Sequence, residues 1–226
     1  MKTGIFCSII LLFSSIQILN AQKISNVDYD DVKVKTQNSA SPYYYNKLLD
    51  RYKKNDTTLT QTDYYYLYFG FTFNSNYDPN NDEAVNALVL SEVEKLNSSK
   101  ALKNALQLYE KDPVNLKLLL YISVCYSNLS DLKLKKIFTD KYAKLIKAIY
   151  NSGDGKTVET AYVVIRVNDE YQLLQVLKLS VKSHALVNTT DVLTIDKKGQ
   201  KAVGKKITTL YFNVYKVFDH YSNTSK

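Results

Sequence analysis

Tyrosine dominates one short stretch of this chain and restricts how that stretch can fold. The protein has 20 tyrosines and no tryptophan. The segment that begins at Ser41 and ends at Tyr77 reads SPYYYNKLLDRYKKNDTTLTQTDYYYLYFGFTFNSNY. Each of its triple-tyrosine runs precedes a leucine-containing segment, so a helix would place aromatic rings on several of its faces at once. Some of these rings must be buried, and others must meet another element or a partner.

The first 21 residues have the features of a secretory signal peptide. A lysine follows the initial methionine, residues 5–19 are mostly apolar, and Ala21 precedes a possible cleavage point before Gln22. The apolar stretch is too short and too interrupted by polar residues for a comfortable membrane span. Because Cys7 lies inside that stretch rather than first in the mature chain, we do not expect a lipid anchor. The sequence predicts a soluble protein of the periplasm or the extracellular space, with no integral membrane segment after cleavage.

The positive charge of the chain is spread along it rather than clustered. The formal net charge is +8. Several lysines occur as isolated pairs, which are typical of solvated faces rather than of a continuous basic surface that binds a nucleic-acid phosphate backbone. We therefore expect no nucleic-acid partner. Cleavage of the signal peptide would leave Cys125 as the one remaining cysteine, which excludes an intramolecular disulfide. Its apolar neighbours predict a buried thiol.

Helical patterns fill the first two thirds of the mature chain. Ser41 as cap and Pro42 in first position predict a helix that ends near Lys54. Thr60 or Thr62 would cap a second helix that closes near Gly70. A loop rich in Asn, Asp and Pro follows at 74–82. Further helices are predicted at 84–96, 101–110, 116–129 and 132–150, of which 116–129 is apolar nearly all round and should be the central buried helix.

The breaks between these helices are similar in layout to the tetratricopeptide repeat. Asp112-Pro113 and the turn at 128–131 separate helices of suitable length, and Pro113 would stand at the closing proline of a repeat. Other signature positions differ, such as Ser123 where glycine is usual. Stacked antiparallel helical hairpins are therefore expected, with or without repeat ancestry.

The composition changes after the Gly-rich turn at 151–155. Residues 191–196 and 207–218 alternate well enough to be strands, joined by a turn at 197–199. Residues 171–179 fit a helix or a third strand, and we favour the strand narrowly. The expected fold is α+β: a single domain at 22–226, mainly helical at 22–150, with a small α/β part at 151–226 whose antiparallel sheet packs on the helices.

Several short segments occur in the order seen in one protein family. They read SPYYY, LYFGF, YDP, SGDGK, DEY and LYFNV. In this order, across residues 29–217, the chain resembles an uncharacterised family of exported Bacteroidetes proteins classed as a domain of unknown function. The resemblance implies bacterial export and a single domain, and it transfers no catalytic residue.

The motifs for cofactors and metals are incomplete. Residues 153–157 end in the Gly-Lys-Thr sequence that closes a phosphate-binding loop, but Tyr150 occupies the position at which that loop needs its first glycine. The acidic segment 78–83 lacks the glycine and the final glutamate of a calcium loop. His184 and His220 are not at the paired spacing of zinc ligands. We therefore expect no cofactor and no metal.

An enzyme is not excluded but is not favoured. There is no Gly-x-Ser-x-Gly sequence for a serine nucleophile. Asp63 could be brought near Asp169 and Glu170 as a carboxyl pair for glycoside hydrolysis. If Asp169 and Glu170 lay on one strand, however, they would point to opposite faces and could not pair with each other. A hydrolase of cell-wall or dietary glycan is therefore the alternative function.

The favoured function is binding or interaction, without a catalytic residue. Exposed tyrosine beside asparagine and aspartate is typical of glycan and peptide sites, because the ring stacks on apolar faces while the amides form hydrogen bonds. If the first two helices form an antiparallel hairpin, the loop after the second returns to the start of the first. The predicted ligand-binding residues are Tyr43, Tyr77, Asn74, Asn76 and Asp78.

Overall fold

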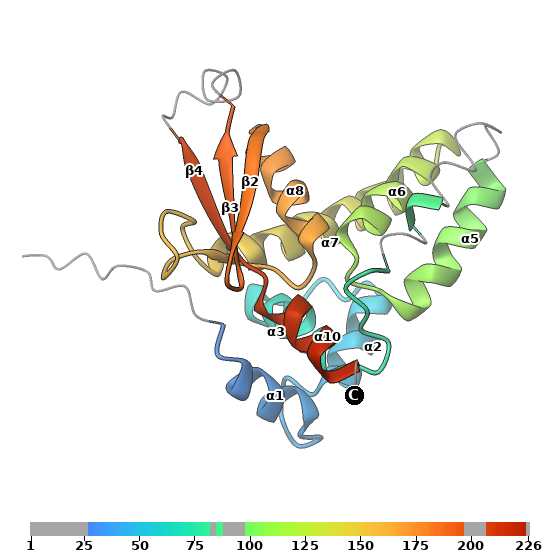
Figure 1. Ribbon diagram of the computed structural model, residues 1–226. Coiled ribbons are helices and arrows are strands. Elements are labelled where there is room, and N and C mark those ends of the chain that lie inside the picture. The colour runs from blue at the N-terminus through green and yellow to red at the C-terminus, as the bar shows by residue number, and fades with distance from the viewer. Residues whose placement is uncertain (1–26, 82–84, 88–97, 197–206, 225–226) are drawn as a thin grey trace, which may run out of the picture.

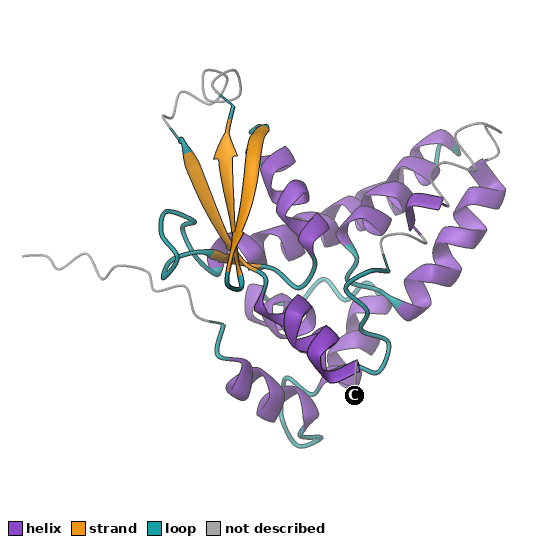
Figure 2. Cartoon of the chain, viewed as in Figure 1, coloured by secondary structure: helices purple, strands orange, loops and turns teal. Residues whose placement is uncertain are grey.

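The computed structural model describes residues 27–81, 85–87, 98–196 and 207–224. Helices make up most of this part of the chain, and a four-stranded sheet stands at one end of the molecule (Figure 2). The predicted α+β class is confirmed. The predicted signal peptide, the turn at 197–199 and most of the predicted helix at 84–96 lie outside the described residues.

Each of the first α-helices begins after a capping side chain or a turn. The elements are α1 (Tyr29–Gln37), α2 (Tyr45–Lys53), α3 (Gln61–Gly70) and the short 3₁₀ helix η1 (Phe71–Phe73). The Asp28 carboxylate caps α1 by accepting a hydrogen bond from the amide of Asp31 (2.9 Å). The predicted start of α2 at Pro42 was wrong. Residues 41–44 form a turn, in which the amide of Tyr44 donates to the Ser41 carbonyl (3.2 Å).

The helix with the second tyrosine run is the most enclosed of the early elements. Thr60 caps α3 as predicted, and the carboxylate of Asp63 accepts a hydrogen bond from the Thr60 amide (2.7 Å). Tyr64, Tyr66 and Tyr68 all have exposed fractions of 6 % or less. These rings form part of the core in the manner of phenylalanine, with their hydroxyls directed to polar partners or to the surface.

The middle of the chain forms the predicted stacked helices. These are α5 (Ser98–Lys111), α6 (Leu116–Asn128) and α7 (Leu132–Asn151), which lie side by side in Figure 1. Cys125 is 3 % exposed, so its predicted burial is confirmed. The predicted central helix, α6, packs against both α5 and α7, but one of its sides faces solvent, where Val124 is 48 % exposed.

The sheet is mixed rather than wholly antiparallel. Its strands are β1 (Tyr162–Val163), β2 (Val181–Val187), β3 (Thr190–Ile195) and β4 (Thr209–Asn213), in the order β1-β4-β3-β2. The pairs β2–β3 and β3–β4 are antiparallel, whereas β1 pairs with β4 in parallel. The strand predicted at 207–218 ends early, because the Asn213 side chain accepts a hydrogen bond from the Tyr215 amide (2.9 Å). The helix α10 (Tyr215–Thr224) begins there.

Residues 171–179 are not a strand. Most of them belong to the helix α8 (Val167–Val176), whose buried side chains are Asp169, Glu170, Gln172, Leu173 and Leu174. The spacing of these residues is that of one helix face, in which two acidic side chains precede two leucines. The strand prediction was wrong because this buried helix face includes two acidic residues, so it is not recognisable in the sequence as an apolar helix face. Figure 1 shows α8 beside the sheet, next to β2, while α10 lies below the end where β2 turns into β3.

The glycine-rich segment after α7 is a turn against the sheet. The amides of Asp154 and Gly155 both donate to the carbonyl of Thr160, at 2.9 and 2.8 Å. Gly155 has φ +67°, and a Cβ there would stand 2.5 Å from the ring of Tyr162. A glycine is therefore required by both backbone conformation and space.

Candidate functional site

The two tyrosines of the predicted ligand surface have different surroundings. Tyr77 is 7 % exposed, and its hydroxyl donates a hydrogen bond to the carbonyl of Ile165 (2.7 Å). Tyr43 is half-buried and stacks on Tyr66, with ring centroids 4.2 Å apart. The expectation that both rings lie exposed on one rim was wrong for Tyr77, because its ring packs edge-on against Phe71 in the core.

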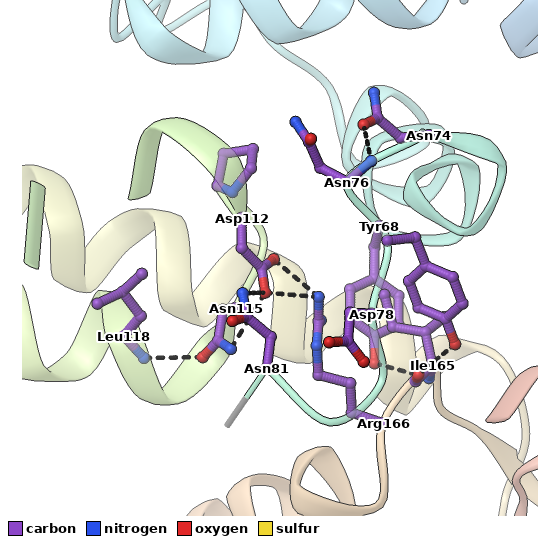
Figure 3. A network of polar contacts seen from close by, with 12 residues as sticks. Tyr68, Asn74, Asn76, Asp78, Asn81, Asp112, Asn115, Leu118, Ile165 and Arg166 are labelled. Atoms are coloured by element: carbon purple, nitrogen blue, oxygen red, sulfur yellow. Dashed lines mark hydrogen bonds and ion pairs between the residues drawn. The ribbon is translucent and has the colours of Figure 1, made fainter. Parts of the chain in front are cut away.

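The three polar residues of that prediction lie in one loop, as Figure 3 shows. The Asn74 side chain accepts a hydrogen bond from the Asn76 amide (2.9 Å), and that of Asp78 accepts one from the Asn80 amide (2.8 Å). These bonds shape the turns of the loop. Asn74 also lines a hollow of about 230 Å³, whose other lining residues are Thr36, Gln37, Tyr44, Tyr45, Asn46, Gly70 and Phe73. Whether these loop residues bind a ligand stays a prediction.

A buried ion pair connects two distant parts of the sequence. One guanidinium nitrogen of Arg166 lies 2.7 and 2.8 Å from the two carboxylate oxygens of Asp112, and both side chains are almost wholly buried (Figure 3). Asn81 and Asn115 also donate to this carboxylate. Asn115 in turn caps α6. The network therefore joins the break between α5 and α6 to the residue that precedes α8.

A second buried contact holds the first turn of α8. The Tyr68 hydroxyl donates to the carboxylate of Asp169 at 2.5 Å and accepts a hydrogen bond from the amide of Ile165 (3.3 Å). Burial and the adjacent Asp169 carboxylate raise the pKa of Tyr68 well above its usual value. Asp169 is thus part of a structural contact between α3 and α8, and it positions the helix that carries Glu170.

A pocket of about 400 Å³ opens between the lower end of the sheet and α10. Its volume is in the range of small-molecule sites. Several of its apolar side chains remain well exposed: Leu186 at 53 %, Val167 at 41 % and Tyr221 at 38 %. We call it the Asp191 pocket, and its lining residues are Val167, His184, Ala185, Leu186, Asp191, Val214, Val217, Phe218 and Tyr221.

Asp191 is the acidic residue in the wall of this pocket. In β3 the buried inner face carries Asp191, Leu193 and Ile195 at alternate positions. Asp191 pairs with Leu186 on β2 and with Phe212 on β4, so it lies between apolar neighbours in the middle of the sheet. It is 8 % exposed, and within the described chain its Oδ1 atom is buried without a hydrogen-bond partner.

Glu170 lies behind Asp191, in the first turn of α8. Its exposed fraction is 0 %, and neither carboxyl oxygen has a hydrogen-bond partner among the described residues. Burial, together with the negative charges of Asp191 and Asp169, raises the pKa of Glu170 to about 9. The side chain is therefore a neutral carboxylic acid at pH 7. The Nδ2 atom of Asn168, two residues earlier, is also buried and without a described partner.

Helix α10 connects this pocket to the loop of the predicted site. The hydroxyl of Tyr221, in the pocket wall, donates a hydrogen bond to the side chain of Asn80. The ring of the next residue toward the sheet, His220, meets Tyr77 edge-on at 5.4 Å. The loop predicted to bind a ligand therefore supports one wall of the Asp191 pocket from outside.

Sequence reasoning missed this pocket, although two signals in the chain point to it. The first is Asp191, which begins the strand DVLTID in the same inward register as a leucine and an isoleucine. The second is the pair Asp169-Glu170 on the apolar face of α8. The edge strand β2 gave no signal, because its side chains from Lys182 to Val187 are exposed and no alternation of burial marks it.

In the described part of the chain, no helix is long and apolar enough to cross a membrane. Nor do three or more histidine, cysteine, aspartate or glutamate side chains gather there in a way that could hold a metal ion.

Comparison with known proteins identifies the family. Neither the curated proteins nor the solved structures gave a match. A family model described as Domain of unknown function (DUF4919) matches residues 30–223, which include every described helix and strand except the ends of α1 and α10. This chain therefore belongs to the DUF4919 family.

Proposed function

We propose that this protein is an exported binding protein that holds a small, largely apolar ligand in the Asp191 pocket. The observation that carries the proposal is the unpartnered Oδ1 atom of Asp191, buried in the wall of a pocket of about 400 Å³. A buried acceptor without a donor costs free energy, on the order of 1–3 kcal/mol. A ligand that donates a hydrogen bond to the Asp191 carboxylate from the pocket offsets this cost, which favours the bound state.

The exposed apolar side chains around the pocket support the same function. Leu186, Phe218 and Tyr221 are between 37 and 53 % exposed and lie on two elements that face one another across the pocket. Exposed apolar groups that converge on a concave surface are typical of ligand sites. A ligand would cover them, and the release of water from these surfaces would contribute to its affinity.

The exported location belongs to the same proposal. It is supported by the apolar stretch at 5–19, by the possible cleavage point after Ala21 and by the resemblance to exported Bacteroidetes proteins. We propose a soluble mature protein in the periplasm or outside the cell, which acts without a cofactor.

A pair of tryptophan variants on one strand tests the pocket. Leu186 lines the pocket, whereas Val187, the next residue of β2, is equally exposed at 52 % and is not among the lining residues. A library of small apolar compounds is screened for those that raise the melting temperature of the wild type. Such compounds should also stabilise the Val187→Trp variant and should fail to stabilise Leu186→Trp. Compounds that stabilise all three proteins alike would place the binding site elsewhere.

The glycan hydrolase remains a second candidate because of one observation. Glu170 holds a proton at pH 7 beside the charged Asp191, and an acid and a carboxylate are the pair that glycoside hydrolysis uses. The 0 % exposure of Glu170 favours the binding function, since a general acid must reach the leaving group. Release of reducing sugar from cell-wall or dietary glycans by the wild type, but not by Glu170→Gln, would establish the hydrolase instead.

A further inference from the structure

We propose that the Asp191 pocket selects an organic cation, namely an amine whose ammonium group meets the Asp191 carboxylate while its apolar body fills the pocket. This inference rests on the proposed function and specifies the ligand class of the same site. It is carried by the missing hydrogen-bond donor at Asp191, by the pairing of the other buried aspartates and by the nature of the pocket walls.

Asp191 is the acidic residue of the pocket wall, and it needs a hydrogen-bond donor. Its Oδ1 atom is a buried acceptor without a partner in the described chain. Glu170 is fully enclosed and keeps its proton at pH 7, so it adds no second carboxylate to the wall. A ligand that is complementary to Asp191 must donate hydrogen bonds, and an ammonium group can donate three.

The other buried aspartates of the described chain each have a donor. Asp112 pairs with Arg166 at 2.7 Å, Asp169 accepts from the hydroxyl of Tyr68 at 2.5 Å, and Asp63 accepts from the backbone and side chain of its capping threonine. A buried carboxylate is stable when it is paired in this way. No donor of the described chain reaches Oδ1 of Asp191, and this residue lines the pocket, so a ligand of positive charge is the best partner for its carboxylate.

The walls of the pocket suit a cation that carries an apolar body. Val214 and Val217 provide aliphatic surface, and Phe218 and Tyr221 provide aromatic rings on the α10 side. Aromatic faces attract ammonium groups as well as apolar groups. An anion would meet the negative charge of Asp191 in a medium of low polarity, which opposes its binding although the whole chain has a net charge of +8.

The test compares two ligands of the same shape. Cyclohexylmethylamine carries a positive charge at pH 7, and cyclohexylmethanol replaces the ammonium with a neutral hydroxyl. Dissociation constants are measured by calorimetry for the wild type, for Asp191→Asn and for Asp50→Asn. Asp50 is an exposed residue of α2 outside the pocket, so its variant controls for the loss of one negative charge.

The wild type and Asp50→Asn should bind the amine at least about tenfold more tightly than the alcohol, as expected for hydrogen bonds to a charged group. Asp191→Asn should lose this preference while its affinity for the alcohol changes little. If Asp191→Asn does not fold, Leu186→Trp replaces it and should bind neither compound. Equal affinities for amine and alcohol in the wild type would overturn the inference and leave the proposed function standing. Failure of both compounds to bind the wild type would count against both.

Discussion

At the scale of single residues, the chemistry of the pocket is set by two acidic side chains in different surroundings. Asp191 reaches the pocket wall, whereas Glu170 is enclosed behind it. Burial alone disfavours the charged form of Glu170, and the neighbouring carboxylates of Asp191 and Asp169 disfavour it further. Glu170 is therefore a neutral acid enclosed in the interior, and Asp191 is the acidic group that a ligand in the pocket can meet.

The pKa of Glu170 predicts how the stability of the fold depends on pH. Because its pKa is raised from 4.5 to about 9, the folded state keeps a proton that the unfolded state loses. The stability from this group is full below pH 4.5 and is lost as the pH rises toward 9. Glu170→Gln cannot ionise, so it should gain stability relative to the wild type by up to about 1.4 kcal/mol per pH unit in this range. Urea unfolding at pH 5, 7 and 8.5 measures the difference, and a constant difference would contradict the burial of Glu170.

The tyrosines of the original site prediction differ in what they contribute to stability. Tyr77 is 7 % exposed and hydrogen-bonded to the Ile165 carbonyl, so Tyr77→Ala should cost about 3–5 kcal/mol. Tyr43 is half-buried and mainly stacks on Tyr66, so Tyr43→Ala should cost clearly less. Urea unfolding of the two single variants gives both values. Equal and small losses would mean that Tyr77 is a surface ring and would restore the predicted ligand surface.

At the scale of elements, α8 holds the pocket in place through two buried contacts at its start. Arg166, just before the helix, is paired with Asp112 at the junction of α5 and α6, and Asp169 is bonded to Tyr68 of α3. The helix is thereby tied to two separate groups of helices. Since Glu170 follows Asp169 directly, its position behind Asp191 depends on these contacts.

Removal of one partner of the buried ion pair should be costly. Asp112→Ala leaves the Arg166 charge buried without its carboxylate and should lower the free energy of unfolding by about 3–5 kcal/mol. The exposed pair of Lys136 and Asp140 on α7 is the control, and Asp140→Ala should cost less than about 1 kcal/mol. The double variant Asp112→Leu with Arg166→Met should be more stable than Asp112→Ala. Similar losses for Asp112→Ala and Asp140→Ala would refute the role of the buried pair.

Sequence patterns predicted the elements whose signals are local. The cap of α3, predicted at Thr60 or Thr62, lies at Thr60, and the predicted break at Asp112-Pro113 is confirmed; both predictions came from short-range chemistry. The start of α2 was wrong because the Ser41 side chain and carbonyl accept hydrogen bonds within a turn instead of beginning a helix. The strand assignment for α8 was wrong because its buried acidic residues depend on tertiary contacts, such as that of Asp169 with Tyr68. The pocket is formed by residues of β2, β3 and α10, and no local sequence pattern predicts that these segments come together.

At the scale of the whole molecule, the pocket lies where the carboxyl-terminal part of the chain folds onto itself. The sheet stands on one side, and α10 returns beneath it toward the tyrosine-rich helices (Figure 1). Contacts of Tyr221 with Asn80 and of His220 with Tyr77 hold α10 in this place. The tyrosine-rich segment therefore supports the pocket by holding α10 in place. The acidic group of the pocket, Asp191, comes from the later, carboxyl-terminal segment.

The most direct test of the binding account is the location of a bound ligand. Methyl NMR spectra report on Val167, Val214 and Val217, which line the pocket, and on Val32 of α1 and Val124 of α6, which do not. Titration with cyclohexylmethylamine should shift the three pocket methyl signals in proportion to saturation, with much smaller changes at Val32 and Val124. Saturable shifts centred on Val32 or Val124, or no saturable shift at the three pocket residues, would contradict the account.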